Sequence, residues 1–276
     1  MKYRMLVSDI DGTLLNSKGE VTPGTIQAIR DAYDNGIIVT LATGRQLRGV
    51  VDIVKQIGIS VPVILGNGAV VVDPLAQKTL LHQTLDEETT KAILEVIQAH
   101  GLWSSVFVHT FEGVDTYYDL DPGFDEAYVF IHKHIPEVVQ QVESLKEVAH
   151  LHPIKVLLID RTEHVLPLYE ALQKLPQTFN MVISDHDWPG FTLLECFHHR
   201  STKASGIRHV AEIFNIPAEQ VVAVGDNTND FEMIEFAGLG VAMGNAHAEL
   251  QERADWITKS NDQDGVAHLI RTKMLS

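Results

Sequence analysis

Short, mostly apolar runs that alternate with helical patterns constrain the fold of this 276-residue chain more than any other feature. Residues 5–8, 37–42 and 61–65 are predominantly apolar and read as buried strands. Between the first two runs, Thr22 fits a helix N-cap and Gly36 fits a helix end. Such alternation is typical of a parallel sheet covered by helices on both faces. We therefore predict an α/β fold with a doubly wound, mostly parallel, Rossmann-like sheet as its core.

The rhythm changes after the third strand. A hairpin pattern over residues 70–82 leads into a helix over about 86–100, and further strand and helix patterns follow without strict alternation. The alternation of strand and helix then returns near the last third of the chain. We predict that residues 1–83 and 193–276 form one catalytic core, and that residues 84–192 form an inserted α+β domain.

Composition excludes several classes of partner. The net charge of −16 argues against a nucleic-acid backbone or an anionic membrane surface as the partner. No run approaches the roughly 18 apolar residues of a membrane span, the N-terminus shows no leader pattern, and the single Cys196 excludes an intrachain disulfide. We expect a cytoplasmic protein without nucleic-acid or membrane partners, and the sequence leaves its oligomeric state open.

Two carboxylates end the first strand. Asp9 and Asp11 stand at i and i+2, and Gly12 follows directly. Like charges at this spacing repel each other unless a cation lies between them, and Mg²⁺ prefers oxygen ligands. Gly12 allows a tight turn that brings backbone N–H groups close to a ligand. An ordinary Asp-Gly turn is the alternative for this segment alone, but related pieces recur downstream.

A second acidic turn follows the apolar run at residues 220–224. Asp226 opens it, and Asn229 and Asp230 lie close behind. The alternative is that Asp226 or Asn227 merely caps the next helix. Together with Asp9, these oxygen-bearing side chains suit a Mg²⁺ site on neighbouring loops.

Further polar groups follow other strands. Thr43 and Gly44 offer a hydroxyl and an N–H that suit a phosphoryl oxygen, and Lys203 offers a positive charge near a helix start. Arg45 either binds substrate or pairs with a carboxylate of the site. Because ligands bind beyond the carboxyl ends of parallel strands, we expect Asp9, Thr43 and Asn67 to share one rim of the sheet.

These pieces resemble the four motifs of the haloacid dehalogenase superfamily. The order and spacing most resemble the Cof-type phosphatases, whose large α+β cap is inserted between the second and third motifs. One difference is that residues 197–202 read Phe-His-His-Arg-Ser-Thr, where such proteins usually carry a turn with Pro or Gly. The motifs are Asp9-x-Asp11-Gly-Thr13, Thr43-Gly-Arg45, Lys203 and Gly225-Asp226-x-x-Asn229-Asp230.

The resemblance implies a Mg²⁺-dependent phosphatase acting on small phosphorylated metabolites, with sugar phosphates as the best guess. Asp9 would attack phosphorus and form an aspartyl-phosphate, while Asp11 would act as general acid and base. Thr43, the Gly44 N–H and Lys203 would stabilise the phosphoryl oxygens. The metal would be held by the Asp9 carboxylate, the Asp11 backbone carbonyl and Asp226, completed by Asn229 or Asp230. Arg45 and Asn67 are candidates for phosphate or substrate contact.

Two other functions share this chemistry. A phospho-ligand sensor without turnover would need neither a nucleophile nor an acid, so the presence of Asp9 and Asp11 speaks against it. A phosphomutase would pass the phosphoryl group to substrate rather than to water, and the sequence does not separate these outcomes. A dinucleotide-binding dehydrogenase is disfavoured, because the glycines of residues 238–244 miss the G-x-G-x-x-G spacing.

Overall fold

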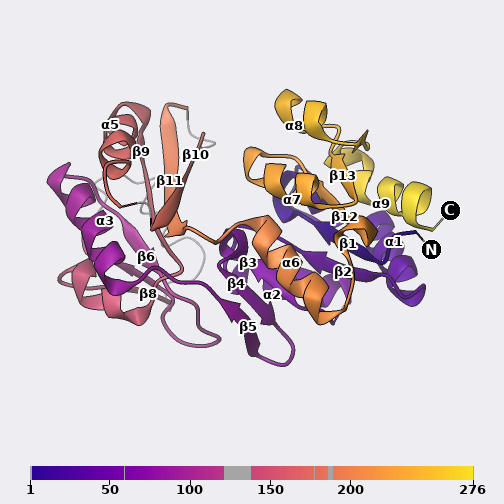
Figure 1. The fold of residues 1–276 in the computed structure, drawn as a ribbon, viewed down its shortest axis with the longest axis horizontal. Helices are drawn as coiled ribbons and strands as arrows, with labels where there is room; N and C mark the ends of the chain where they lie inside the picture. The colour runs from indigo at the N-terminus through magenta and orange to yellow at the C-terminus, as the bar shows by residue number, and fades with distance from the viewer. Residues whose placement is uncertain (1, 59, 121–137, 177, 186–188, 276) are drawn as a thin grey trace. The chain divides into compact units, whose positions relative to one another are not determined.

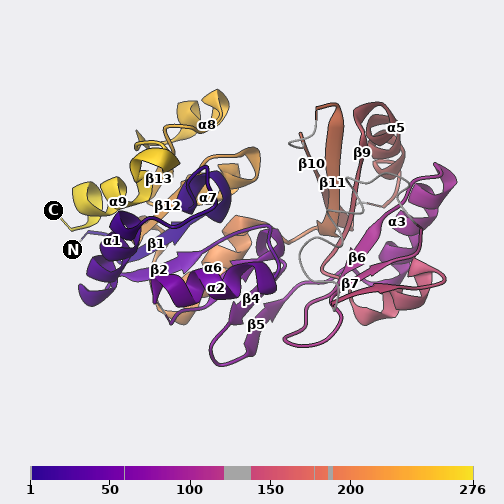
Figure 2. The same cartoon turned by 180° about the vertical axis from the view of Figure 1, so that it is seen from behind.

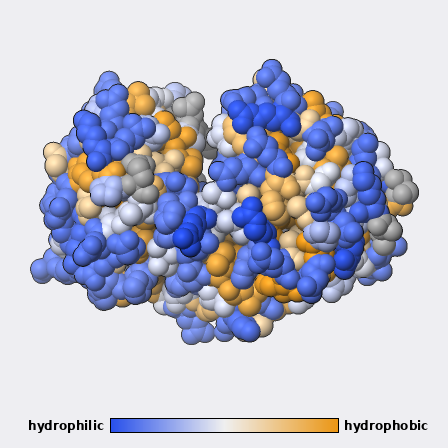
Figure 3. Space-filling model, viewed as in Figure 1, coloured by the Kyte–Doolittle hydropathy of each residue, from blue (hydrophilic) through white to orange (hydrophobic). Residues whose placement is uncertain are grey.

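The computed structural model describes residues 2–58, 60–120, 138–176, 178–185 and 189–275. The chain divides into two compact units, which we call the first unit (Met1–His82 and Thr202–Ser276) and the second unit (Gln83–Ser201). Hydrophilic residues cover most of the visible face of each unit in Figure 3, with smaller apolar patches between them. Within the described ranges, no helix has the length and apolar character needed to cross a membrane.

The first unit is built on a five-stranded parallel sheet in the order β14-β13-β12-β1-β2 (Figure 1). All four residues of the central strand β1 are buried. Parallel pairing places the carboxyl ends of all five strands at one edge of the sheet. The strands are β1 (Met5–Ser8), β2 (Ile38–Leu41), β12 (Val221–Gly225), β13 (Leu239–Ala242) and β14 (Trp256–Ile257).

Helices cover both faces of this sheet. On one face, Ile207, Met233 and Leu250 from α6, α7 and α8 join Met5 and Val7 in one apolar cluster. Helices α1 and α2 lie on the opposite face (Figures 1 and 2). The doubly wound α/β core is therefore as predicted. The helices are α1 (Pro23–Asp34), α2 (Arg48–Ile57), α6 (Lys203–Ile213), α7 (Phe231–Phe236), α8 (Ala248–Arg253) and α9 (Gly265–Leu269).

The third predicted strand differs from expectation. Strand β3 (Val63–Leu65) begins a separate antiparallel sheet with β4 (Val70–Asp73) and β5 (Lys78–His82), and one parallel bridge between Ala42 and Ile64 connects it to the end of β2. The turn η2 (Gly66–Gly68) explains the difference. All three of its residues have positive φ, so the chain reverses directly onto β4 instead of crossing over through a helix.

The second unit contains a six-stranded sheet in the order β10-β11-β9-β6-β7-β8, in which only β7 and β8 pair in parallel among the described strands. Helices α3 (Glu87–Ala99) and α5 (Thr162–Leu172) pack with the 3₁₀ segment η4 (Leu145–Leu151) against one face of it, in a single apolar cluster. The strands are β6 (Ser105–Phe107), β7 (Thr116–Tyr118), β8 (Val139–Gln141), β9 (Lys155–Arg161), β10 (Phe179–Asp185) and β11 (Phe191–His198).

The two ends of the second unit are joined to each other. Ser201 Oγ donates a hydrogen bond to Gln83 Oε1 across 3.2 Å. Strand β11 belongs wholly to this unit because it pairs with both β9 and β10, so the first unit resumes at Thr202, whereas we predicted that the core resumes at residue 193. The assignment of the units as catalytic core and cap stays a prediction.

Candidate active site

The first acidic turn starts where β1 ends. The Asp9 N–H continues the sheet pairing by donating to the Val224 carbonyl at 3.0 Å, and the chain then turns through η1 (Ile10–Leu14). Gly12 has φ +77°, a conformation that strongly favours glycine. The turn leaves the Asp9 residue only 5% exposed. The sequence thus places a buried carboxylate at the carboxyl end of the central strand.

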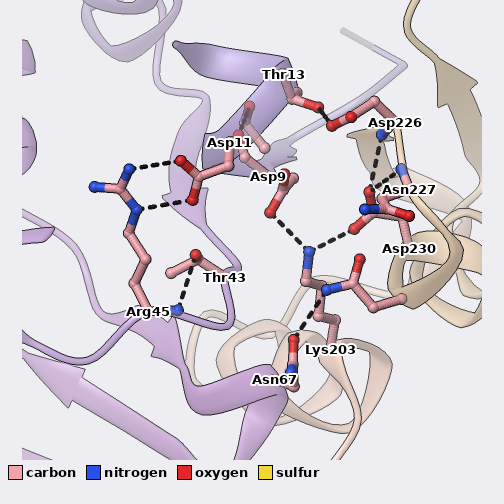
Figure 4. A network of polar contacts seen from close by, with 12 residues as sticks. Asp9, Asp11, Thr13, Thr43, Arg45, Asn67, Lys203, Asp226, Asn227 and Asp230 are labelled. Atoms are coloured by element: carbon pink, nitrogen blue, oxygen red, sulfur yellow. Dashed lines mark hydrogen bonds and ion pairs between the residues drawn. The ribbon is translucent and has the colours of Figure 1, made fainter. Parts of the chain in front are cut away.

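Lys203 lies between two buried carboxylates (Figure 4). Its Nζ donates to Asp9 Oδ1 at 2.7 Å and to Asp230 Oδ1 at 2.5 Å, and the residue is 2% exposed. A capping box between Thr202 and Ser205 fixes the start of α6, where Lys203 is the first residue. Burial alone would lower the pKa of Lys203, but the carboxylates of Asp230 and Asp9 raise it above the ordinary lysine value. Lys203 is therefore a positive charge fixed inside the site and not a surface lysine.

The second acidic turn is held by Asp230. Its Oδ2 accepts hydrogen bonds from the Asp226 N–H at 2.8 Å and the Asn227 N–H at 3.0 Å, while its Oδ1 faces Lys203. Gly225 makes room for this arrangement, since a Cβ there would lie 2.3 Å from Asp230 Oδ2. One carboxylate thus shapes the loop and fixes the lysine.

The two acidic turns contact each other directly. Thr13 Oγ1 donates to Asp226 Oδ1 at 2.6 Å. A Cβ on Gly12 would lie 2.3 Å from Asp226 Oδ2, so only glycine allows this approach. These contacts hold Asp226 beside the turn that carries Asp9 and Asp11, as Figure 4 shows.

Three carboxylates gather at this point with one cation. Each of Asp9, Asp226 and Asp230 offers an oxygen within 4.8 Å of the other two. Burial raises the pKa of Asp9 to about 8, against the opposing effect of Lys203, and burial also raises the pKa of Asp226 to about 6. Lys203 cannot balance three negative charges, so this all-oxygen donor set suits a hard divalent cation.

The other two predicted metal ligands lie differently. Asp11 was predicted to contribute its backbone carbonyl, which the carboxylate cluster does not test, and its carboxylate binds Arg45. The Asn229 side-chain amide donates to Asn67 Oδ1 at 3.1 Å.

Arg45 forms a bidentate ion pair with Asp11. Its Nε donates to Asp11 Oδ2 at 2.8 Å and its Nη2 to Oδ1 at 2.5 Å, and these bonds raise the pKa of Arg45. Of the two roles considered for Arg45, the structure shows pairing with a carboxylate. The pair orients the Asp11 carboxylate at the rim of the site.

The turn after β2 approaches the turn after β3. Buried Thr43 donates its N–H to the Ile64 carbonyl at 3.0 Å, and its Oγ1 accepts the Arg45 N–H at 3.1 Å. The Asn67 N–H donates to the Thr43 carbonyl at 3.0 Å, and a Cβ on Gly44 would lie 3.2 Å from Asn67 Oδ1. Asn67 thereby connects these turns to Asn229 of the second acidic turn.

Gly68 lies close to Thr202, so the start of α6 packs against the turn that follows β3. A Cβ on Gly68 would lie 1.9 Å from the Thr202 carbonyl oxygen, so a larger residue would push the helix that begins with Lys203 away. All the predicted site residues therefore lie on turns of the first unit that contact one another. The segment Phe197–Thr202 also turns without Pro or Gly, because the Ser201 N–H donates to the His198 carbonyl at 2.8 Å.

Two polar residues that were not among the predicted site residues contribute to the site. Asn227 caps the second acidic turn, and Asn245 Nδ2 donates to the Gly12 carbonyl at 2.8 Å. Asn245 follows β13, so its position after a strand of the parallel sheet was the signal that could have identified it.

Comparisons with known proteins agree with this geometry. The family model for haloacid dehalogenase-like hydrolases matches residues 6–270. The phosphatase YwpJ of Bacillus subtilis strain 168 is 30% identical, with 97% of this chain and 99% of YwpJ covered. The putative phosphatase YxeH of the same strain is also 30% identical, with 99% of each chain covered.

A solved structure shows the same fold. The crystal structure of a haloacid dehalogenase-like hydrolase from Bacteroides thetaiotaomicron matches with a TM-score of 0.82 and 28% identity, covering 98% of this chain and 99% of that chain. The predicted enzyme class, a phosphoric monoester hydrolase, is confirmed by these named phosphatases. With a family model matched over nearly its full length, this chain belongs to the haloacid dehalogenase-like hydrolases.

Proposed function

We propose that this protein is a Mg²⁺-dependent phosphatase that hydrolyses small phosphorylated metabolites through an aspartyl-phosphate on Asp9. The observation that carries the proposal is the buried Asp9 carboxylate, bonded to Lys203 at 2.7 Å and clustered with Asp226 and Asp230 within 4.8 Å. A purely structural ion pair needs one carboxylate per lysine, and this cluster has two more. The surplus charge favours a site that takes up a cation together with a phosphate ester.

The donor set fits the metal that the family implies. Asp9, Asp226 and Asp230 would hold Mg²⁺, with Asn229 or the Asp11 carbonyl oxygen completing its shell. When bound, Mg²⁺ would supply positive charge that offsets the repulsion between the Asp9 carboxylate and the phosphate.

The protein's own residues account for the remaining steps. An Asp9 carboxylate oxygen forms a bond to phosphorus as the bond from phosphorus to the leaving oxygen breaks, and Asp11 supplies a proton to that oxygen. A water then attacks phosphorus, Asp11 accepts its proton, and the bond between phosphorus and Asp9 breaks. The products are an alcohol and inorganic phosphate.

Other groups act on the phosphoryl oxygens. Lys203 donates from Nζ, Thr43 from its hydroxyl and Gly44 from its N–H. Arg45 holds the Asp11 carboxylate through two hydrogen bonds, from Nε at 2.8 Å and from Nη2 at 2.5 Å. In the first step Asp11 acts in its protonated form, released from Arg45, and the proton that it takes from water in the second step restores that form.

The second unit would serve as the cap. Its residues, Gln83–Ser201, are inserted in the sequence between the second and third motifs. We assign to it the choice among phosphorylated metabolites, with sugar phosphates as the first class to test.

Phosphate release from a panel of sugar phosphates, nucleotides and cofactor phosphates tests the proposal. The wild type is compared with Asp9→Asn, each with Mg²⁺ and with EDTA. We expect release by wild type with Mg²⁺ only, and a phosphate adduct on Asp9 by mass spectrometry after rapid quenching. Activity that persists in EDTA would remove the metal from the mechanism. Binding of phosphorylated ligands without any turnover would support a sensor, and transfer to a second substrate hydroxyl would support a mutase.

A further inference from the structure

Two asparagines from distant loops hold the backbone of the first acidic turn. Asn245 Nδ2 donates to the Gly12 carbonyl at 2.8 Å, and Asn261 Nδ2 donates to the Leu15 carbonyl at 2.9 Å. Gly12 lies inside the turn η1, and Leu15 ends it. We call Asn245 and Asn261 the asparagine clamp.

The two members of the clamp also bind each other. The Asn261 N–H donates to Asn245 Oδ1 at 2.9 Å, so each end of the Asn245 amide has a backbone partner. The adjacent Asp262 accepts the Ser17 N–H at 2.8 Å, which extends the contact past the end of the turn. Two loops, one after β13 and one after β14, thus act together on a single segment.

The orientation of the Gly12 carbonyl determines the conformation of that segment next to Asp11 and Thr13. Because the peptide between Gly12 and Thr13 is planar, fixing the carbonyl oxygen also fixes the plane of the Thr13 N–H. Gly12 itself has φ +77° and no side chain, so its own conformation offers little resistance to rotation. The groups on either side are Asp11 and Thr13, and Thr13 Oγ1 donates to Asp226 Oδ1 at 2.6 Å.

We infer that Asn245 and Asn261 are positioning residues. They hold the peptide between Gly12 and Thr13, next to Asp11, in the geometry needed for turnover. Neither side chain is bonded to Asp9, Lys203 or the acidic cluster, so their effect passes through the turn backbone. The inference deepens the proposed function and rests on it.

Replacing Asn245 tests the clamp. Asn245→Ala removes both bonds, and Asn245→Asp keeps the acceptor for the Asn261 N–H but cannot donate to Gly12. We expect kcat to fall about tenfold in both variants with KM within about twofold, because small misplacements of reacting groups are costly. Asn261→Ala is a second variant and should lower kcat less, since Asn245 still reaches Gly12.

Asn35 offers matched controls. Its Nδ2 donates to the Asp31 carbonyl at 2.8 Å at the end of α1, in the same kind of exposed amide-to-backbone bond. Asn35→Ala and Asn35→Asp should leave kcat unchanged. An equal fall in kcat in these controls, or a kcat for Asn245→Ala within twofold of wild type, would overturn the inference. A loss confined to Asn245→Asp would do the same, because it would indicate the added charge.

Amide hydrogen exchange of a peptide spanning residues 8–16 gives a readout that needs no turnover. We expect faster exchange in Asn245→Ala than in wild type and no change in Asn35→Ala, because a released turn opens more often. Unchanged exchange in Asn245→Ala would refute the clamp even if kcat fell. If wild type releases phosphate from no substrate, the proposed function fails, while this measurement still decides whether the clamp exists.

Discussion

Each unit of this protein buries a lysine against carboxylates, but the balance of charge differs. In the second unit, Lys155 Nζ lies 2.6 Å from Glu195 Oε1, with both side chains about one-tenth exposed, at 9% and 10%. In the first unit, Lys203 faces Asp9 and Asp230, and Asp226 lies within 4.8 Å of both. The Lys155–Glu195 pair is neutral, whereas the cluster around Lys203 carries surplus negative charge.

The difference separates a structural ion pair from a site. The Lys155 ammonium also lies 5.0 Å from the centroid of the Phe107 ring, in a setting that stabilises the cation within the sheet. Three carboxylates around Lys203 repel one another, and burial holds the pKa of Asp9 and of Asp226 above ordinary values. Surplus negative charge of this kind is typical of a site that takes up a cation.

The largest expected effect comes from Asp9→Asn. We expect kcat to fall more than about a thousandfold, equal to about 4 kcal/mol in the barrier, because the amide is no nucleophile. Asparagine keeps an oxygen for Lys203 and removes one charge from the surplus, so the melting temperature should not fall. Steady-state kinetics and thermal unfolding of the same samples check both parts. Activity within tenfold of wild type would exclude Asp9 as the nucleophile.

Glu195→Gln tests the balanced pair. The change removes the ionised group that lies 2.6 Å from the buried Lys155 ammonium, and we expect a loss of about 3 kcal/mol in the free energy of unfolding. The double substitution Lys155→Met with Glu195→Leu should recover most of this loss, since apolar residues of similar size often replace buried pairs without cost. Urea denaturation measures all three proteins. A double variant as unstable as Glu195→Gln would contradict the view that this pair is structural.

Mg²⁺ should stabilise the protein through the carboxylate cluster of the first unit and not through the Lys155–Glu195 pair. We expect saturating Mg²⁺ to stabilise the wild type by about 2.7 kcal/mol at a hundred times its dissociation constant. In EDTA, Asp226→Asn should be more stable than wild type by about 1 kcal/mol, because removing the charge relieves repulsion. The same variant should lose most of the Mg²⁺ effect. Thermal unfolding of both proteins with and without Mg²⁺ measures these differences. If Mg²⁺ stabilises Asp226→Asn as much as wild type, Asp226 is not part of the metal site.

The smallest expected effect on stability comes from Asp86, whose carboxylate accepts a hydrogen bond from the backbone. Asp86 caps α3, and its bond from the Thr89 N–H, 2.7 Å long, lowers its pKa. A lowered pKa stabilises the fold above the unfolded value near 3.8, and this contribution is lost as the pH falls through the folded pKa. Asp86→Ala should therefore cost about 1 kcal/mol at pH 7 and less at pH 3.

Asp86→Ser is the matched control for that measurement. Serine also caps helices but does not titrate in this range, so its difference from Asp86→Ala should not depend on pH. Denaturant titrations at both pH values provide the comparison. A pH-independent cost of Asp86→Ala relative to wild type would show that the carboxylate charge contributes nothing to this cap.

Local patterns were enough to predict the core of the fold. The N-cap at Thr22, the glycine after α1 and the apolar runs of β1, β2 and β12 identify the alternating elements. The antiparallel return of β3 onto β4 was not predictable from apolar pattern, because it depends on three successive residues with positive φ at Gly66–Gly68. Asn67 is the least expected of the three, because a positive φ is uncommon for a residue other than glycine.

The proximity of Asp9, Thr43 and Asp226 was predictable, because each follows a strand of the parallel sheet and parallel strands end at one edge. Their partners were not. Nothing in the sequence near Arg45 indicates that it binds Asp11 rather than a ligand, because the two are 34 positions apart. The role of Asn245 depends on a backbone carbonyl 233 positions away, and no side-chain motif records such a contact.

The bond between Gln83 and Ser201 has a consequence for how this architecture diversifies. An insert whose entry and exit are tied together can be exchanged as a cassette, because the host chain meets the same two neighbouring ends whatever lies between them. Lys203 stands two residues beyond Ser201, so a change in length between them would displace the lysine from Asp9 and Asp230. Under the proposed function, exchanging this insert would change which phosphorylated metabolite is accepted and would leave Asp9 and Lys203 in place.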